Sequence, residues 1–336
     1  MAATKYGDIS QRTAAYAEKK MLEHAEPILV LEKFAEAKPL PKNTADNIKF
    51  RRPIPYAVST TQLVEGVTPV PKSMSYEDVT VTLGQYGDLI QISDKVYDLN
   101  EDPVLNDAAM LAGEQAAETR ELILWGVLKA GTNVAYSGLA ATPAARTDVN
   151  DVITLNLQRN AIRSLKNQRA KPITTMVSAS PKFATEAVAA GFVAFAHTDA
   201  EQDIRDMDGF VPVERYGSQA PLSPWECGKV ENVRYILSPV LAPFIDAGST
   251  TLNSMTSTGG SQVDVYPVIF ISKNCYGTVA LKGANSMSPR VINPGTIDKS
   301  DPLGQRGFVG WKMYFASLIL NEAWIQRVEV GVSALS

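Results

Sequence analysis

The chain has 336 residues, of which 45% are hydrophobic and 20% are charged, and its formal net charge is −4. This length and composition predict a soluble globular protein with a sizeable core. The weak negative charge argues against a protein that grips nucleic acid electrostatically, but not against one that surrounds it.

The sequence also argues against secreted, membrane-spanning and disulfide-rich proteins. The first twenty residues lack an apolar core, so no signal peptide is predicted, and no run approaches the ~18 apolar residues of a membrane span. The two cysteines, Cys227 and Cys275, exclude a disulfide framework or a thiolate metal cluster. A single bridge between them stays open, and two buried free thiols are the favoured interpretation.

Residues 1–55 are predicted to form an N-terminal arm. Ala, Glu and Lys dominate as far as Ala37, with helix expected over 11–26 and 28–37. Four prolines then keep the segment extended and outside a sheet interior; they are Pro39, Pro41, Pro53 and Pro55. Such an arm must lie on its own domain or on a neighbour.

Residues 56–95 are predicted to form a long hairpin. Its outgoing strand is expected at Leu63 and Val64, its wide polar tip at 65–78, and its return strand at 79–83, where the side chains alternate strictly. Because two strands alone are marginally stable, we expect the hairpin to reach another subunit.

A long helix is predicted over 103–130. Asp102 is the expected N-cap and Pro103 the first helical residue, and Gly131 is expected to end the helix in the left-handed conformation. One face, expected to pack on strands around 311–320, carries Leu105, Ala109, Ala112 and Ala116. The glutamates expected to face outward are Glu114, Glu118 and Glu121.

Residues 148–262 are predicted to be α+β. In chain order we expect a helix over 151–166, a strand over 174–177, a helix from Ser180 to Gly191, a helix from Asp199 to Met207, strands over 233–237 and 263–271, and a flexible surface loop over 247–260. Pro267 places the second of these long strands at an edge or a bulge. Two further strands, over 308–319 and 324–330, are expected to pack on the long helix and complete its domain.

No catalytic pattern is visible in the sequence. The two histidines, His24 and His197, lie far apart, and phosphate-cradling, nucleophile-elbow and zinc-helix motifs are missing from the sequence. His197 is interpreted as a helix-end or surface residue. The stretch 98–102 resembles the start of a calcium loop but lacks its glycine and its glutamate, so we interpret it as a turn and cap. This pattern favours a structural or assembly protein.

Three stretches together resemble the major capsid (coat) proteins of tailed bacteriophages, in particular the podophage-type coat family. They are LVEGVTPVPKSMSYEDVTVTLGQYGDLIQISD in the hairpin, DPVLNDAAMLAGEQAAETRE in the long helix, and DPLGQRGFVGWK with LILNEAW near the end. The resemblance spans roughly residues 55–332. It implies the α+β Hong Kong 97-type capsid fold, with an N-arm at 1–55, an E-loop at 56–95, a P-domain at 96–135 and 301–336, and an A-domain at 148–300.

The same resemblance implies a function. The chain would assemble with itself into hexameric and pentameric capsomers of an icosahedral virion shell, which forms in the host cytoplasm. The shell would enclose double-stranded DNA without binding a specific sequence. No cofactor, metal or membrane is implied. A portal protein and decoration or cement proteins are implied partners. Some members carry a long N-terminal scaffolding domain, and this arm is too short for one, so a separate scaffolding protein is a further hypothesis. Two alternatives remain: an encapsulin-like shell around protein cargo, and an unrecognised enzyme.

Charged residues on the protruding parts are candidate inter-subunit contacts. We expect the cations Arg51, Arg52 and Lys72 to meet carboxylates of neighbouring subunits, and the candidate carboxylates are Glu65, Glu77, Asp78, Glu114 and Glu118. The alternative is that these are free surface charges that contribute little. Lys72 is also a conceivable donor for an isopeptide bond, although an ordinary solvated or ion-paired lysine is the favoured interpretation.

Overall fold

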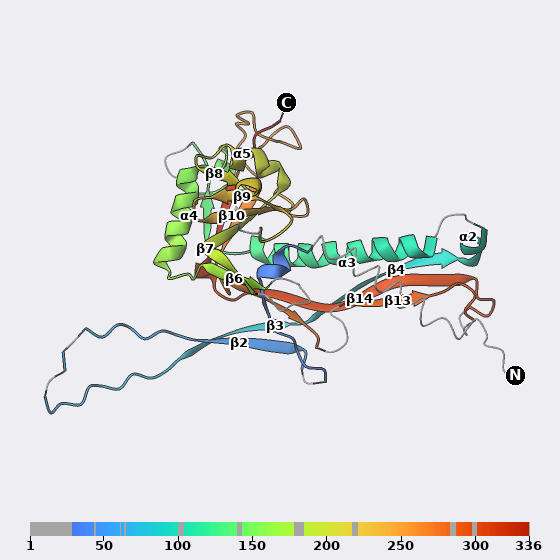
Figure 1. Ribbon diagram of the computed structural model, residues 1–336, viewed down its shortest axis with the longest axis horizontal. Coiled ribbons are helices and arrows are strands. Elements are labelled where there is room, and N and C mark those ends of the chain that lie inside the picture. The colour runs from blue at the N-terminus through green and yellow to red at the C-terminus, as the bar shows by residue number, and fades with distance from the viewer. Residues whose placement is uncertain are drawn as a thin grey trace.

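The computed structural model describes residues 29–43, 45–60, 62–63, 65–99, 104–139, 143–177, 185–216, 221–282, 287–297 and 301–335. The predictions about the helix at 11–26, His24, the helix start at Asp102 and Pro103, and Ser180 with Pro181 lie outside these residues. Figure 1 shows three parts: an elongated platform under one long helix, a compact domain at one end of it, and a long hairpin that projects from their junction.

The platform is one helix on a five-stranded sheet. Helix α3 (Val104–Lys129) packs along strand β14 (Arg306–Ile319). The other strands are β1 (Glu36–Ala37), β4 (Gly84–Ser93), β12 (Tyr276–Ala280) and β13 (Met287–Ile292). Leu105, Ala109, Ala112 and Ala116 are buried in one cluster with residues of β14, among them Trp311 and Phe315. The predicted small-residue face is therefore confirmed, and its short side chains let the sheet approach the helix closely.

The end of α3 differs from the prediction. Gly131 is not in the left-handed conformation; instead its N–H donates to the carbonyl of Leu128 at 3.3 Å, and that of Ala130 to Val127 at 3.1 Å. The next free N–H, on Thr132, donates to the carboxylate of Glu322 at 3.1 Å. The helix therefore ends in two tightened i→i+3 turns, and the Glu322 carboxylate holds the chain just beyond it; the predicted left-handed glycine end is wrong.

The compact domain is built on an eight-stranded mixed sheet. Its order is β5 (Val134–Tyr136), β15 (Ile325–Val330), β11 (Tyr266–Ile271), β7 (Thr185–Ala196), β10 (Val233–Leu237), β9 (Glu226–Val230) and β8 (Phe210–Pro212), with β6 (Ile173–Val177) beside β7. Helices α4 (Leu155–Asn167), which Thr154 caps, and α5 (Glu201–Arg205) cover one face. The last turns of α3 cover the other face, with Leu124, Trp125 and Leu128.

Short 3-10 helices complete the described chain. They are η2 (Leu31–Phe34), η3 (Arg146–Asp148), η4 (Thr198–Ala200), η5 (Val213–Arg215) and η6 (Glu322–Trp324). The helix predicted over 28–37 is wrong, because this stretch forms only η2 and the two-residue strand β1. The helix expected from Asp199 is confirmed as η4 followed by α5.

Two predictions in the compact domain are wrong, each for its own reason. The stretch expected to be a helix up to Gly191 is strand β7 from Thr185 onward, and Pro267 lies in β11, inside the sheet. Alternate residues of β7 enter the clusters on its two faces, so its apolar run has no period that distinguishes strand from helix. Pro267 is tolerated because the ladder between β11 and β7 starts only at Ile269.

Two pairings were also wrongly predicted. The strand opposite β3 (Tyr76–Thr82) is β2 (Asn47–Pro53), and not the stretch at Leu63. The last strand, β15, joins the sheet of the compact domain instead of lying along α3. Both errors concern segments far apart in the sequence, whose pairing local patterns do not encode.

Candidate assembly interface

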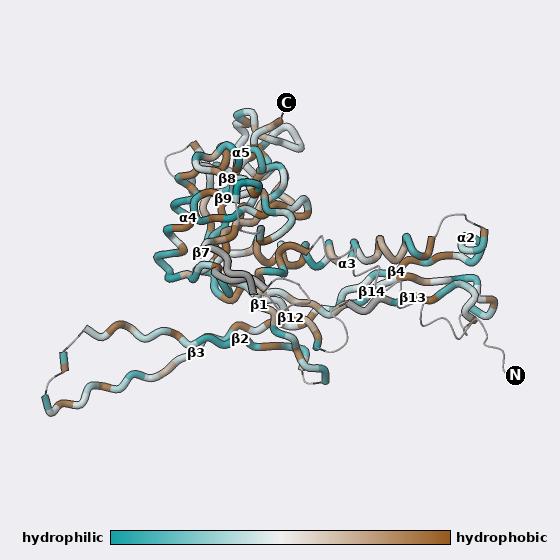
Figure 2. Tube along the Cα trace, viewed as in Figure 1, coloured by the Kyte–Doolittle hydropathy of each residue, from teal (hydrophilic) through white to brown (hydrophobic). Residues whose placement is uncertain are grey.

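The projecting hairpin exposes an unusual amount of apolar surface. Beyond β2 and β3 the chain runs as an extended loop over 54–75, and Figure 2 shows hydrophobic segments along it. Eight large apolar side chains of this part are 46–88% exposed: Ile54, Tyr56, Val58, Leu63, Val67, Val70, Met74 and Tyr76. Such a concentration of exposed large apolar side chains indicates a site of contact with another molecule.

One face of the hairpin links its buried base to its exposed loop. Side chains alternate along β2, so Phe50, Arg52 and Ile54 lie on the same face. Phe50 is buried against β12 and β14, in a cluster with Val279 and Leu318. Toward the loop this face is only partly covered by its own chain, and Ile54 is 46% exposed. The hairpin is therefore anchored at its base and unpartnered at its end.

The candidate cations on the hairpin have partners within their own chain. Arg51 and Asp78 form two parallel hydrogen bonds of 2.7 and 2.9 Å, which hold the pKa of the Asp78 carboxyl below its usual range. Arg52 and Glu77 pair next to them at 2.5 Å. Lys72 donates to the carbonyl of Ala57 at 2.9 Å across the loop. All of these side chains stay accessible, so a contact with a neighbouring subunit remains a prediction.

The remaining candidate carboxylates lie apart from this group of cations. Glu65 is exposed in the turn at the far end of the loop, and Glu118 is exposed on α3. Glu114 is half-buried one helical turn earlier. The outer side of α3 also carries exposed apolar residues, Leu111 at 61% and Leu122 at 49%. The long helix therefore presents a mixed acidic and apolar stripe.

Glu121 does not face outward as predicted, because it is buried and anchors the N-terminal segment. Its carboxylate accepts hydrogen bonds from the backbone N–H groups of Val30 at 2.5 Å and Leu31 at 3.0 Å. The preceding residue, Arg120, pairs with Glu32, and the hydroxyl of Tyr276 donates to the carbonyl of Leu31 at 2.6 Å. Burial raises the pKa of Glu121 to about 7.

A signal for this anchor was present in the sequence. Glu121 follows Ala117 by four residues and precedes Leu124 by three, and both of these are buried. The helical period therefore places Glu121 on the buried face. Its charge led to the opposite interpretation, because its partners lie ninety residues away in the sequence.

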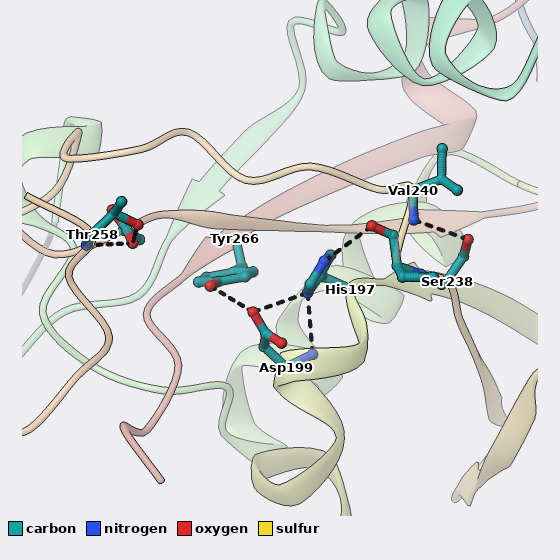
Figure 3. A network of polar contacts seen from close by, with 8 residues as sticks. His197, Asp199, Ser238, Val240, Thr258 and Tyr266 are labelled. Carbon is teal, nitrogen blue, oxygen red and sulfur yellow. Dashed lines mark hydrogen bonds and ion pairs between the residues drawn. The ribbon is translucent and has the colours of Figure 1, made fainter. Parts of the chain in front are cut away.

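His197 is a structural residue at a helix end, as predicted. It precedes η4, where the backbone N–H of Asp199 donates to its Nδ1 at 3.2 Å, and its Nε2 contacts the carbonyl of Pro239 at 3.2 Å (Figure 3). The Tyr266 hydroxyl donates to Asp199 at 2.8 Å. The hydroxyl of Ser238 accepts from Val240 at 3.4 Å. Nothing in this network prepares a nucleophile.

The two cysteines are buried thiols, as the sequence favoured. Cys227 and Cys275 are free and buried, and burial raises the pKa of each thiol to about 12. Within the described ranges, His, Cys, Asp and Glu side chains form no group of three that could hold a metal ion. No helix in the described part of the chain is both long enough and apolar enough to cross a bilayer.

The architecture defines the class of protein. A long helix on a narrow platform, a compact domain at one end and a projecting hairpin form the Hong Kong 97-type fold of phage capsid proteins. Two solved capsids share it: that of Ralstonia phage GP4, with a TM-score of 0.64 at 11% identity over 91% of this chain and 90% of that one, and that of cyanophage Pam1, with a TM-score of 0.56 at 14% identity over 100% and 95%.

The sequence comparisons show the family. A family model described as phage capsid protein matches residues 76–325, which is more than half of the chain. The chain belongs to this family. A curated relative, the major capsid protein of Pseudomonas phage KPP21, is 22% identical over 263 residues, which span 74% of this chain and 66% of that protein, just under two thirds of its length. An encapsulin of Synechococcus elongatus has the same fold, with a TM-score of 0.51 at 13% identity over 90% and 87%.

Proposed function

We propose that this chain is the major capsid protein of a tailed bacteriophage. Copies of it assemble into hexameric and pentameric capsomers and then into an icosahedral virion shell that encloses double-stranded DNA. In this proposal the N-arm spans 1–55, the E-loop 56–95, the P-domain 96–135 and 301–336, and the A-domain 148–300. Three departures follow from the sheets: the paired base of the E-loop begins at Asn47, β12 and β13 belong to the platform, and β15 belongs to the compact domain. The role is structural and needs no catalytic residue or cofactor.

The apolar loop at 54–75 is the observation that carries the proposal. A monomer gains nothing from displaying seven large hydrophobic side chains on an extended loop, with an eighth, Tyr76, at the start of β3, whereas a shell subunit buries them on each neighbour. Because a closed shell repeats each contact many times, each contact can be weak by itself.

The charged candidates fit the same scheme as inter-subunit contacts. Arg51, Arg52 and Lys72 flank the apolar loop, and Glu114 and Glu118 lie beside the exposed apolar residues of α3. A hairpin lying over the α3 stripe of a neighbour would bury apolar side chains and bring arginines near glutamates. Glu77 and Asp78 orient the arginines, and Glu65 lies at the far end of the loop.

Electron microscopy of the purified full chain tests the proposal. We expect closed, uniform shells, either from the chain alone or after co-expression with a scaffolding protein of the same phage. Particles purified from infected cells should contain this chain as their most abundant protein. Unassembled chains under both conditions, with no copy in the virion, would contradict the proposal.

The likeness to an encapsulin keeps one second candidate in view, a compartment shell around protein cargo. The contents of the shells separate the two functions. Packaged DNA supports the capsid, and a packaged enzyme supports the compartment. A portal protein and decoration proteins are further proposed partners, and they would be found by mass spectrometry of the same virions.

A further inference from the structure

A cleft of about 840 Å³ lies between the base of the hairpin and the compact domain. Phe50, Ile54 and Val79 contribute apolar atoms from the hairpin, and Leu320 and Trp324 contribute them from the opposite side. The Trp324 ring is fixed, because its Nε1 donates to the carbonyl of Gln168 at 3.1 Å. The cleft is therefore a preformed apolar groove, with a volume in the range of pockets that bind ligands.

The charge of the cleft is opposite to that of the whole chain. Five cationic side chains line it: Lys38, Arg51, Arg52, Arg169 and Lys171. Two carboxylates, Glu36 and Glu77, oppose them, which leaves a net charge of +3 in a chain whose net charge is −4. Among the described residues, Arg169 and Lys171 have no ion-pair partner. The cleft is thus suited to an acidic segment with apolar side chains.

Arg169 holds a backbone conformation that glycine adopts at lower cost. It follows the C-cap of α4 with a φ of 56°, while its N–H donates to Lys166 and that of Ala170 to Leu165. A side chain in this left-handed position costs about 1 kcal/mol relative to glycine. The conformation places a long cation at the rim of the cleft.

A segment with complementary properties lies at the other end of the platform. Helix α2 (Asp94–Leu99) has six residues and none of them is buried. Its exposed apolar side chains are Val96, Tyr97 and Leu99, at 43%, 45% and 75%. Two carboxylates, Asp94 and Asp98, and one cation, Lys95, lie among them, so the helix is acidic by one charge. Figure 1 shows α2 at the tip of the platform, far from the compact domain, so one copy cannot place it in its own cleft.

We propose that the cleft at the base of the hairpin receives helix α2 of a second copy of this chain. The apolar side chains of α2 would pack on Phe50 and Trp324, and Asp94 and Asp98 would pair with Arg169 and Lys171. The contact is head-to-tail, because the two surfaces are different parts of the chain. It rests on the proposed shell function and adds a contact separate from the hairpin loop.

Other acidic segments of the chain fit the cleft less well. Around α5, Glu201 and Asp206 are accessible, but the apolar residues beside them, Ile204 and Met207, are buried in their own core. The stripe on α3 belongs to a helix of 26 residues lying flat on the platform, so it presents a surface for a flat partner. The turn around Asp301 also exposes apolar side chains, Ile297 and Leu303, but its carboxylate already pairs with Arg306. Helix α2 instead keeps accessible carboxylates beside its apolar side chains.

Site-directed cross-linking in assembled particles tests this contact. Lys171→Cys and Asp98→Cys are introduced into one chain, shells are confirmed by microscopy, and a short bis-maleimide is added. The two native thiols are buried with a raised pKa, so they react slowly. We expect a ladder of cross-linked dimers and longer species on a denaturing gel. Lys171→Cys with Asp208→Cys, an exposed residue after α5, is the matched control and should stay monomeric.

A charge-swap cycle measures how much the ion pairs between α2 and the cleft contribute to assembly. Arg169→Glu with Lys171→Glu should lower the yield of shells at least about tenfold, and Asp94→Lys with Asp98→Lys should do the same. Combining both pairs of substitutions in one chain should restore most of the yield of shells. No such recovery is expected if each pair alone had lowered the yield by preventing folding. Intact shells with no ladder and no restored yield would overturn the contact and leave the proposed function standing. Absence of shells from the unmodified chain would count against the function itself.

Discussion

The compact domain and the projecting hairpin use β-strands in opposite ways. In the compact domain, residues 192–196 of β7 and the strands β10 and β11 are buried on both faces, so Phe195, Tyr235 and Phe270 have almost no contact with solvent. In the hairpin only the base of one face is covered, and the loop beyond it exposes side chains of the same apolar kind. Similar residues therefore stabilise the fold of one region and remain available for contact in the other.

This difference separates two kinds of stability. Burial of the sheet contributes to the free energy of unfolding of a single chain, because each covered side chain loses contact with water on folding. The exposed loop contributes nothing of this kind until a neighbour covers it. Substitutions in the compact domain should thus change folding, and those in the hairpin should change assembly.

The largest effect is expected from the core of the compact domain. Phe270→Ala removes a fully buried ring whose centroid lies 6.3 Å from that of Tyr235, and should lower the free energy of unfolding by about 3–5 kcal/mol. Urea unfolding of the unassembled chain measures it. Val70→Ala on the loop is the matched control, expected within about 0.5 kcal/mol of the unmodified chain. Equal losses in the two variants would remove the distinction between the regions.

A smaller effect is expected where the N-terminal segment is anchored. Burial raises the pKa of Glu121 to about 7, so the folded chain binds this proton more tightly than the unfolded chain does. The resulting stability is fully present below about pH 4.5 and is lost as the pH rises through about 7. Glu121→Gln keeps an acceptor for Val30 and Leu31 without the charge, and should gain up to roughly 3 kcal/mol relative to the unmodified chain at pH 8.

Urea unfolding between pH 5 and 8 measures this gain. The difference between the two chains should grow with pH up to about 7.5 and then level off. Glu118→Gln, on the exposed side of the same helix, should show no such slope. A constant difference at all pH values would mean that Glu121 does not titrate in this range.

A still smaller change in stability is expected at the base of the hairpin. Arg52→Glu breaks an exposed ion pair with Glu77 and should cost the monomer less than about 1 kcal/mol. We expect it to block shell formation, because it reverses a charge on the face that leads to the loop. Arg159→Glu breaks a similarly exposed pair with Glu231 on α4 and serves as the control that should still assemble. Normal shells from Arg52→Glu would exclude this contact.

The smallest effect on the monomer is expected at the loop itself. Val58→Ser with Val70→Ser changes two side chains that are 77% and 88% exposed, so unfolding should stay within about 0.5 kcal/mol. The same variant should reduce self-association, as measured by sedimentation velocity, and prevent closed shells. If it assembled like the unmodified chain, the apolar loop would not be a subunit contact.

Much of the fold could be predicted from local patterns. The long helix with its small-residue face and the strands at 233–237 and 308–319 were predicted from local sequence, and the structure confirms them. The candidate contacts were found from charge and protrusion, and the structure paired Arg51 with Asp78 and Arg52 with Glu77. Glu121 was misplaced because its charge outweighed a helical period that pointed to burial.

The sequence by itself determined which segments are periodic, apolar or interrupted by proline, because those properties depend on neighbours along the chain. Only the tertiary structure decided that β2 pairs with β3, that β15 enters the far sheet, and that the apolar stretch of β7 is a strand buried on both faces. These choices depend on the surfaces that distant segments can bury together. The same reason explains why the cleft, formed by residues from 36 to 324, is invisible in the sequence.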